Sequence, residues 1–186
     1  GRQSMIINIT RVVARIKLIP TQPDGSEIHD YNPIDVSTTA MTGTPYTVEK
    51  AFVMSPFGAP CNSPPWGELI SVNLASGLIE WRVPLGSIEK QLPIPIPLEW
   101  GVPNFGGPIV TAGGLIFIAA TIDQKFRAFD IDNGKKLWQT KLPAGAQTAP
   151  ITYQLNGRQY VVITAGGHKN LGNKRGDFVV AYSLPQ

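Results

Sequence analysis

The chain has 186 residues, of which 42% are hydrophobic and 16% charged, a balance typical of a globular protein that buries a core. Its formal net charge is +3, but the 16 Lys and Arg residues are scattered without a basic run, which argues against nucleic acid as a partner. Because 19 Gly and 17 Pro are spread along the sequence, we expect many tight turns between short strands and therefore an all-β fold.

The first third of the chain combines one strand-forming segment with polar and proline-rich segments. Met5 to Leu18 is rich in β-branched residues and favours a strand. The segment 21–44 is polar and rich in turn residues, and we interpret it as an exposed loop excursion. Prolines and small residues dominate Pro56 to Trp66, which predicts a loop with little regular structure.

The rest of the chain predicts short strands in regular succession, and no segment shows helical periodicity. Glu68–Leu74 and Glu80–Pro84 are expected to pair through a turn at Ala75–Gly77. In Leu92–Pro97 every second residue is proline, which excludes a central strand and favours an extended, polyproline-like loop. Further strands are expected at Ile109–Thr111, Leu115–Ala120, Lys125–Ile131, Lys136–Leu142, Thr148–Gln154, Tyr160–Thr164 and Phe178–Ser183.

Two segments, 71–81 and 128–138, resemble one another. Both have a small residue, an Asp or Asn two positions later, and then Gly-x-x-x-Trp. In such a hairpin Gly77 or Gly134 supplies the positive φ of the turn, and the tryptophan returns on the next strand. A tryptophan repeated in this way can wedge against the neighbouring repeat. We interpret the repeat as a β-propeller, the alternative being two hairpins that share turn chemistry by coincidence.

The repeat resembles the tryptophan-docking motif of the quinoprotein alcohol dehydrogenases, which are eight-bladed propellers. Other segments resemble one branch of these proteins, the membrane-bound glucose/quinate/shikimate dehydrogenases that use pyrroloquinoline quinone (PQQ). In chain order these segments are Gly43–Tyr46, Ser55–Cys61, Pro64–Gly67, Gly101–Pro108, Thr111–Ala120, Tyr160–His168 and Gly176–Tyr182. The resemblance runs from about Met5 to the end of the chain. It implies that residues 1–186 are the C-terminal segment of a longer protein, the last three or four blades of its propeller.

This resemblance implies an oxidoreductase that oxidises an aldose such as glucose, or quinate or shikimate. Its electrons would pass to membrane ubiquinone through an N-terminal anchor, on the periplasmic side of the inner membrane. The catalytic aspartate of the family falls outside this chain, so we assign no catalytic residue and expect the isolated chain to be inactive. A Ca²⁺ or Mg²⁺ ion accompanies PQQ in the family, but the sequence offers no cluster of ligands at metal-binding spacing.

The resemblance also implies a set of cofactor-binding residues. Asp123 follows an apolar strand and matches an aspartate at the cofactor, an ordinary turn aspartate being the alternative. Phe105, which precedes Gly106, matches a tryptophan beside PQQ; it keeps the aromatic ring and loses the N–H donor. Asn8 matches an asparagine near PQQ, although a capping or turn role suits it as well. Gly106 is assigned to the cofactor together with Phe105.

Two further side chains have competing interpretations. His168 lies in a Gly-Gly-His turn and matches a histidine near the sugar substrate, a surface or structural histidine being the alternative. Arg127 could meet a carboxylate of PQQ, but we interpret it as a surface cation on a strand.

Two other kinds of protein remain compatible with the repeat. One is a non-enzymatic propeller scaffold of the outer-membrane assembly type, which shares tryptophan-docking repeats and has no cofactor. The other is one subunit of a split quinoprotein. In either case an open propeller segment exposes strand edges and apolar faces, so we expect self-association.

Overall fold

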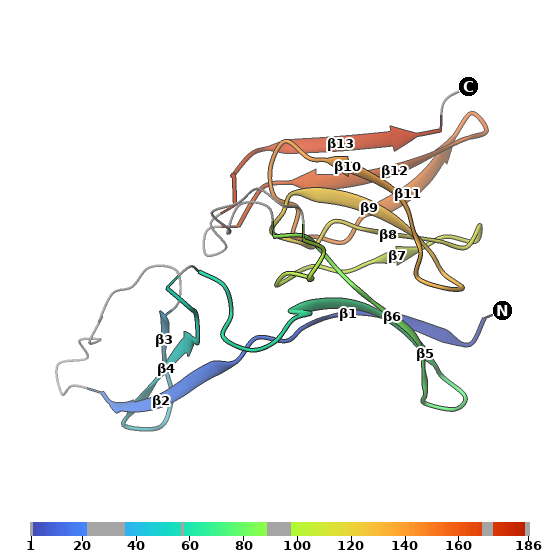
Figure 1. Ribbon diagram of the computed structural model, residues 1–186. Helices are drawn as coiled ribbons and strands as arrows, with labels where there is room; N and C mark the ends of the chain where they lie inside the picture. Colours follow the sequence, from blue (N-terminus) through green and yellow to red (C-terminus); the bar gives the residue numbers. More distant parts are fainter. Residues whose placement is uncertain (1, 22–35, 57, 89–97, 169–172, 185–186) are drawn as a thin grey trace. The chain divides into compact units, whose positions relative to one another are not determined.

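A computed structural model describes residues 2–21, 36–56, 58–88, 98–168 and 173–184. These residues form strands and turns, and none of them lies in a helix (Figure 1). The chain divides into two compact units, one comprising residues 1–11 and 64–186 and the other Val12–Ser63. The predicted all-β fold class is therefore confirmed.

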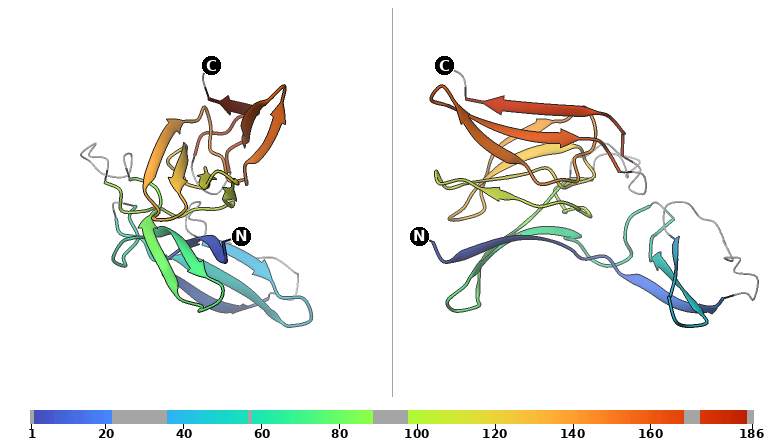
Figure 2. Two further views of the ribbon diagram at one scale, coloured as in Figure 1. Left: turned by 90° about the vertical axis from the view of Figure 1, so that its right-hand side faces the viewer. Right: turned by 180° about the vertical axis from the view of Figure 1, so that it is seen from behind.

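The larger unit consists of three antiparallel sheets that follow one another as blades (Figures 1 and 2). The first sheet has the order β1-β5-β6, the second β10-β9-β8-β7 and the third β11-β12-β13. Their strands are β1 (Ser4–Thr10), β5 (Gly67–Asn73), β6 (Ile79–Pro84), β7 (Ile109–Val110), β8 (Leu115–Ile118), β9 (Lys125–Asp130), β10 (Lys136–Lys141), β11 (Ile151–Leu155), β12 (Arg158–Ala165) and β13 (Phe178–Ser183). Every strand predicted after residue 67 is present, with ends that shift by a few residues.

The smaller unit is a three-stranded sheet with the order β2-β4-β3. Its strands are β2 (Ala14–Pro20), β3 (Val36–Ala40) and β4 (Tyr46–Phe52). The predicted strand Met5–Leu18 is thus divided between β1 and β2, which lie in different sheets. Of the predicted loop 21–44, residues 22–35 lie outside the described residues, as does the proline-rich segment 92–97, whereas residues 36–40 form β3. The Ser and Thr residues of β3 are common in loops, which is why a loop was predicted there. Thr is also favoured in strands, and β3 pairs with β4.

The two repeats form the same hairpin twice. Gly77 and Gly134 both have positive φ, at +71° and +70°. The register between strands skips Glu80 in the first hairpin and Leu137 in the second, so that each tryptophan directly follows a β-bulge. A bulge twists its strand and turns the next side chain, and here it does so at the same position in both repeats.

Trp81 of the first repeat docks on the hairpin of the second. Its indole Nε1 donates to the carbonyl oxygen of Ile131 at 2.9 Å. A Cβ at Gly134 would lie only 2.6 Å from Cε3 of the Trp81 ring, so that the ring rests directly on the glycine backbone. The expectation that this tryptophan wedges against the neighbouring repeat is confirmed.

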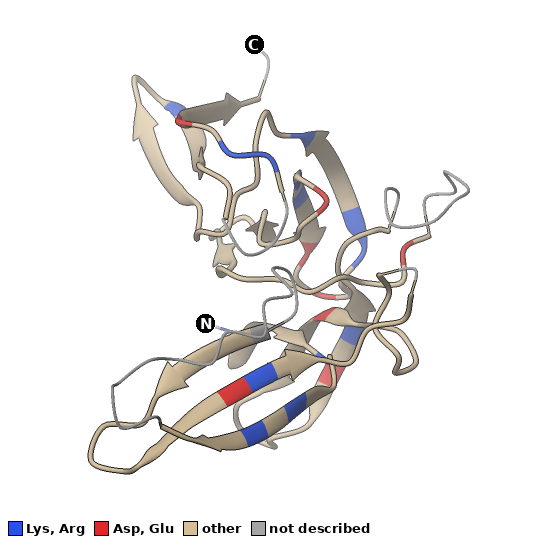
Figure 3. Ribbon diagram, turned by 90° about the vertical axis from the view of Figure 1, so that its left-hand side faces the viewer, with Lys and Arg blue, Asp and Glu red and all other residues tan. Residues whose placement is uncertain are grey.

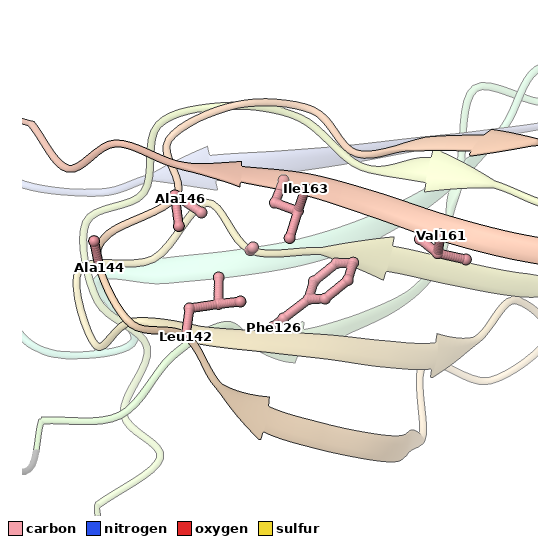
Figure 4. Close-up of a cluster of buried hydrophobic side chains, with 8 residues drawn as sticks. Phe126, Leu142, Ala144, Ala146, Val161 and Ile163 are labelled. Atoms are coloured by element: carbon pink, nitrogen blue, oxygen red, sulfur yellow. The ribbon is translucent and has the colours of Figure 1, made fainter. Parts of the chain in front are cut away.

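Two hydrophobic clusters join the three sheets. The cluster between the first and second sheets contains Leu69, Leu85, Ile116, Ile118, Ala120, Phe129 and Ile131. The cluster between the second and third sheets contains Ala119, Phe126, Leu142, Ala144, Ala146, Val161, Ile163 and Ala165 (Figure 4). Because Phe126, Leu142 and Ile163 are almost fully buried, the sheets are held face to face by apolar packing, which fixes where the loops at their ends lie.

Candidate functional site

Residues 104–106, which precede β7, are contacted by side chains from the first and the third sheet. Asn8 of β1 donates through Nδ2 to Asn104 Oδ1 at 2.6 Å and to the carbonyl oxygen of Gly106 at 3.1 Å. Gly106 has a φ of +111°, and a Cβ there would come within 2.9 Å of the backbone at Gln147. Only glycine therefore lets this loop lie against the chain that leads into the third sheet.

Phe105, in the loop before β7, and His168, in the turn after β12, stack on one another. Their ring centroids are 6.0 Å apart and their planes are inclined by 10°. Phe105 is 45% exposed. The backbone N–H of His168 donates to Asn173 Oδ1 at 2.8 Å, which fixes the turn that carries the imidazole. Four of the five residues predicted for the site, Asn8, Phe105, Gly106 and His168, are thus brought together.

Asp123 lies at the edge of this group and is turned inward. Residues Asn104 and Thr121 form a β-bridge, and the Thr121 hydroxyl donates to Asp123 Oδ1 at 2.6 Å. The Asp123 side chain is only 5% exposed and forms an ion pair with Arg127, whose side chain is 3% exposed. The interpretation of Arg127 as a surface cation is therefore wrong. The strand pattern did not reveal its partner, because that partner lies in the preceding turn.

The protein itself fills both oxygens of the Asp123 carboxylate with donors. Oδ1 accepts from Thr121 Oγ1, Lys125 N and Arg127 Nη1, and Oδ2 from Ser87 N, Ser87 Oγ and Arg127 Nη2. Burial raises the pKa of the Asp123 carboxyl, but the charge of Arg127 and these hydrogen bonds outweigh that effect and hold the pKa below its usual value. Asp123 is therefore ionised, and it ties the turn after β6 to the turn before β9.

Sequence reasoning missed Asn104, the residue to which Asn8 is bound. Asn104 is 6% exposed and makes hydrogen bonds through its side chain and its backbone. It stands in the segment Gly101–Pro108, which was noted for its resemblance as a whole. Nothing in the local sequence connects it to Asn8, because the two are 96 positions apart.

The residues at this loop offer an aromatic surface and amide groups, the kinds of contact that a planar ligand with polar edges uses. The exposed Phe105 ring lies next to Gly106, which is also exposed, so both are open to a flat molecule. Beside Gly106, both polar atoms of the Gln147 carboxamide are buried and have no hydrogen-bond partner in the described part of the chain. A buried amide without partners is costly, so a polar group or an ordered water is expected to complete it. Arg127 is committed to Asp123, and so the site offers ring and amide contacts rather than a free guanidinium.

Three further features of the described residues concern metal ligands, the distribution of charge and membrane-spanning helices. Among the described residues, no three His, Cys, Asp or Glu side chains gather where they could hold a metal ion. Basic and acidic residues are interspersed along the described strands (Figure 3). No helix of a length and hydropathy suited to crossing a bilayer occurs within the described ranges.

Comparison with protein families gives a match over most of the chain. The β-propeller domain of PQQ-dependent glucose, ethanol and alcohol dehydrogenases matches residues 1–161.

Curated relatives cover the chain but are much longer. The chain is 42% identical over 187 residues to quinoprotein glucose dehydrogenase A of Acinetobacter calcoaceticus, covering 99% of this chain and 23% of that protein. It is 48% identical to the quinoprotein glucose dehydrogenase of Escherichia coli K12, covering 77% of this chain and 18% of that protein. It is 40% identical to the quinate/shikimate dehydrogenase (quinone) of Acinetobacter baylyi, covering 97% and 23%. The chain thus spans about a fifth of the length of these relatives.

Solved structures agree on the fold. A europium-containing methanol dehydrogenase matches with a TM-score of 0.52 and 26% identity, covering 87% of this chain and 23% of that one. The quinohemoprotein alcohol dehydrogenase of Comamonas testosteroni matches with a TM-score of 0.56 and 20% identity, covering 97% and 24%. The second likeness bears on the fold alone, and it supports the partial propeller inferred from the repeat.

Proposed function

Because the chain belongs to the family of PQQ-dependent glucose/ethanol/alcohol dehydrogenase β-propeller domains, we propose that the protein containing it oxidises a hydroxyl group of a sugar or polyol. An aldose such as glucose is the first candidate substrate, and quinate or shikimate is the second. The names of the relatives support both. The observation that carries the proposal is that Asn8 of β1 and His168, which follows β12, both contact the loop that carries Phe105 and Gly106.

These residues would hold PQQ at the exposed face of the loop. When bound, PQQ supplies the acceptor for the hydride, which carries both electrons away from the substrate. The Phe105 ring offers a flat apolar surface, the exposed Gly106 would lie beside the ligand, and Asn8 offers a polar contact. His168, stacked on Phe105 and exposed, would contact the substrate. Asp123 would act through the turn that it fixes, because its oxygens are already filled by the protein.

Other parts of the mechanism belong to the longer protein. We assign the ligands of a Ca²⁺ or Mg²⁺ ion to the rest of the longer protein, as the resemblance implies. The catalytic base is also assigned outside this chain. Transfer of electrons to membrane ubiquinone, at the periplasmic side of the inner membrane, completes the proposal. The isolated chain is expected to be inactive and to self-associate through its open strand edges.

The non-enzymatic scaffold is not favoured, because the relatives that are 40–48% identical are named as dehydrogenases. A split quinoprotein differs from the proposal only in which polypeptide carries the remaining blades. Co-purification of a second polypeptide that restores PQQ-dependent glucose oxidation to this chain would favour it.

The proposal is tested by titrating the full-length protein with PQQ and following the absorbance of the cofactor. Phe105→Ala is expected to weaken binding about tenfold, equivalent to about 1.4 kcal/mol, because the stacking surface is lost. Tyr153→Ala is a matched control: its ring is 44% exposed and stacked on Tyr160, but it lies in the middle of β11. An unchanged dissociation constant in Phe105→Ala would remove the site from this loop.

Oxidation of substrate provides the second test. His168→Ala is expected to raise KM for glucose or quinate about tenfold while the PQQ dissociation constant stays unchanged. The 186-residue chain, mixed with PQQ and a dye acceptor, should not oxidise glucose. Turnover by this chain alone would contradict the assignment of the catalytic base to another part of the protein.

A further inference from the structure

The hydrogen bonds of Asn104 determine which atom of Asn8 can face a ligand. Asn104 Nδ2 donates to the carbonyl oxygens of Ile9 at 2.9 Å and Val102 at 3.3 Å. Because carbonyl oxygens only accept hydrogen bonds, the amide nitrogen must lie on this side. A rotated Asn104 carboxamide would set its own oxygen against two carbonyls. Its Oδ1 is therefore fixed on the side of Asn8.

The backbone holds Asn104 equally firmly. Its N–H donates to Thr10 Oγ1 at 3.1 Å, and the Thr10 hydroxyl lies 3.2 Å from the Asn104 carbonyl oxygen, to which it donates. Thr10 is the last residue of β1, and Asn104 lies in the loop that carries Phe105. These hydrogen bonds therefore tie the loop to the first sheet. With 6% of its surface exposed, Asn104 has little freedom to adopt another rotamer.

The orientation of Asn104 passes to Asn8. Since Asn104 Oδ1 can only accept, the Asn8 atom 2.6 Å away must be the amide nitrogen. The second hydrogen of that nitrogen goes to the Gly106 carbonyl oxygen at 3.1 Å. Both donors of Asn8 are thus used within the protein. Its Oδ1 remains, and within the described residues this oxygen accepts no hydrogen bond.

We propose that Asn104 is a positioning residue that presents Asn8 to the bound molecule as a hydrogen-bond acceptor alone. Asn8 would then recognise an N–H or O–H group and would not bind a carboxylate or quinone oxygen. PQQ carries one such group, its pyrrole N–H, and a sugar or polyol substrate carries several hydroxyls. This inference rests on the proposed function, because it concerns the same loop.

The test uses the full-length protein and two readouts, the PQQ dissociation constant and KM for the substrate. Asn8→Ala removes the acceptor and is expected to raise one of these constants about fivefold to tenfold. Asn104→Ala leaves Asn8 in place but frees its carboxamide, so it should raise the same constant by a similar factor. In the double variant the two effects should not add, because Asn104 acts only through Asn8.

Asn8→Asp separates an acceptor from a donor. The aspartate keeps oxygen acceptors and loses the two donors, so it should lower the melting temperature more than Asn8→Ala does. It should nevertheless bind the ligand at least as well as Asn8→Ala. Weaker binding by Asn8→Asp than by Asn8→Ala would mean that the ligand presents an acceptor there, and would overturn the proposal.

Asn73→Ala is the matched control for a structural effect. The Asn73 side chain also makes three hydrogen bonds, two from backbone N–H groups and one to Glu80, but it lies in the hairpin between β5 and β6. It should lower the melting temperature without changing either constant. If Asn104→Ala behaves in the same way, Asn104 is structural only and the proposal fails.

The two readouts locate the donor. A changed PQQ dissociation constant places it on the cofactor, and a changed KM alone places it on the substrate; both outcomes support the acceptor role. If Phe105→Ala weakens PQQ binding while Asn8→Ala and Asn104→Ala leave both constants unchanged, only this inference fails. If all three variants bind PQQ normally, the proposed function of the loop fails as well.

Discussion

The two tryptophan hairpins have the same sequence pattern, turn and bulge, yet their tryptophans end in different surroundings. Trp81 rests on Gly134 and donates to the Ile131 carbonyl oxygen. Trp138 is 38% exposed. Its ring contacts those of Phe126 and Tyr182 edge-on, with ring centroids 5.8 and 5.3 Å apart, respectively. It also lines a groove of about 1000 Å³ between β10 and the third sheet. The local sequence therefore determines the hairpin, whereas the next sheet determines how its tryptophan is buried.

The repeats differ again on the strand that precedes the turn, β5 in the first repeat and β9 in the second. Aligned on their tryptophans, the first repeat has Trp66 and Ile70 where the second has Asp123 and Arg127. Ile70 is 4% exposed, and the side chain of Arg127 is 3% exposed. The same place in the two blades is thus filled by apolar packing in one and by an ion pair in the other. A buried ion pair contributes little net stability when intact, but removing one partner is costly.

The largest effect is expected from making the second repeat resemble the first. In the full-length protein, Arg127→Ile leaves the Asp123 carboxylate buried without its cation, and should lower the free energy of unfolding by about 3–5 kcal/mol. Urea unfolding measures the change. The double variant Asp123→Asn with Arg127→Ile should recover part of the loss, because no charge is left buried. A loss below about 1 kcal/mol in Arg127→Ile would mean that the pair is hydrated.

The same pair predicts an acid dependence of stability. The folded pKa of Asp123 lies below its unfolded value, so its stabilising contribution is fully present well above the unfolded pKa and is lost as the pH falls through the folded pKa. In Arg127→Ile the isolated carboxyl should have a raised pKa, and acidification should then favour the folded state. The stability gap between wild type and variant should therefore narrow between pH 7 and pH 3. A constant gap across this range would contradict the pairing.

A smaller effect separates the two turn glycines. Gly77→Ala meets no atom within 4 Å and should cost only the strain of a positive φ, about 1–2 kcal/mol. Gly134→Ala adds a Cβ that collides with the Trp81 ring, so it should cost about 1–3 kcal/mol more. Thermal unfolding of the two full-length variants measures the difference, which reports the docking of Trp81. Equal losses would show that the ring moves away freely.

The smallest effect concerns the indole N–H groups. Trp81→Phe keeps most of the apolar ring and removes the donor to Ile131, which should cost about 1 kcal/mol. Trp138 makes no such hydrogen bond among the described residues, so Trp138→Phe should change stability by less than about 0.5 kcal/mol. Unfolding followed by circular dichroism avoids the loss of the fluorescent residue. A larger effect at Trp138 would reverse the comparison.

Much of the fold could be predicted because its signals are local. The hairpin around Gly77 and the one around Gly134 each carry their turn, bulge and tryptophan within a short segment. Strand β3 was missed because its Ser and Thr residues are equally typical of loops, and only pairing with β4 makes them a strand. Arg127 was predicted to be a surface cation for a related reason. A buried cation needs an anionic partner, and the alternation of apolar and polar residues along a strand does not reveal that Asp123 is that partner.

The site was predictable only in part. The resemblance pointed to Asn8, Phe105, Gly106, Asp123 and His168, and the fold brings the first three and His168 into contact. It could not indicate that Asp123 faces Arg127 or that Asn104 orients Asn8. The ion pair joins a strand residue to the turn before it, which the alternation of apolar and polar residues does not display, and a hydrogen bond between residues 8 and 104 leaves no trace in either local sequence.

The pairing of β1 with β5 has a consequence for how this segment tolerates change. Thr10 faces Gly67 in register, and the Arg11 N–H donates to the Trp66 carbonyl oxygen at 2.8 Å, so the blade closes at the point where residues 12–63 depart. Because the pairing of β1 with β5 already holds the two ends of segment 12–63 together, doubling the length of that segment should cost only about 0.6 kcal/mol in chain entropy. We therefore expect the segment between residues 11 and 64 to be a site where insertions are tolerated. Segments of very different length, or a whole foreign module, can be accommodated there without a change in the register of the strands that form it.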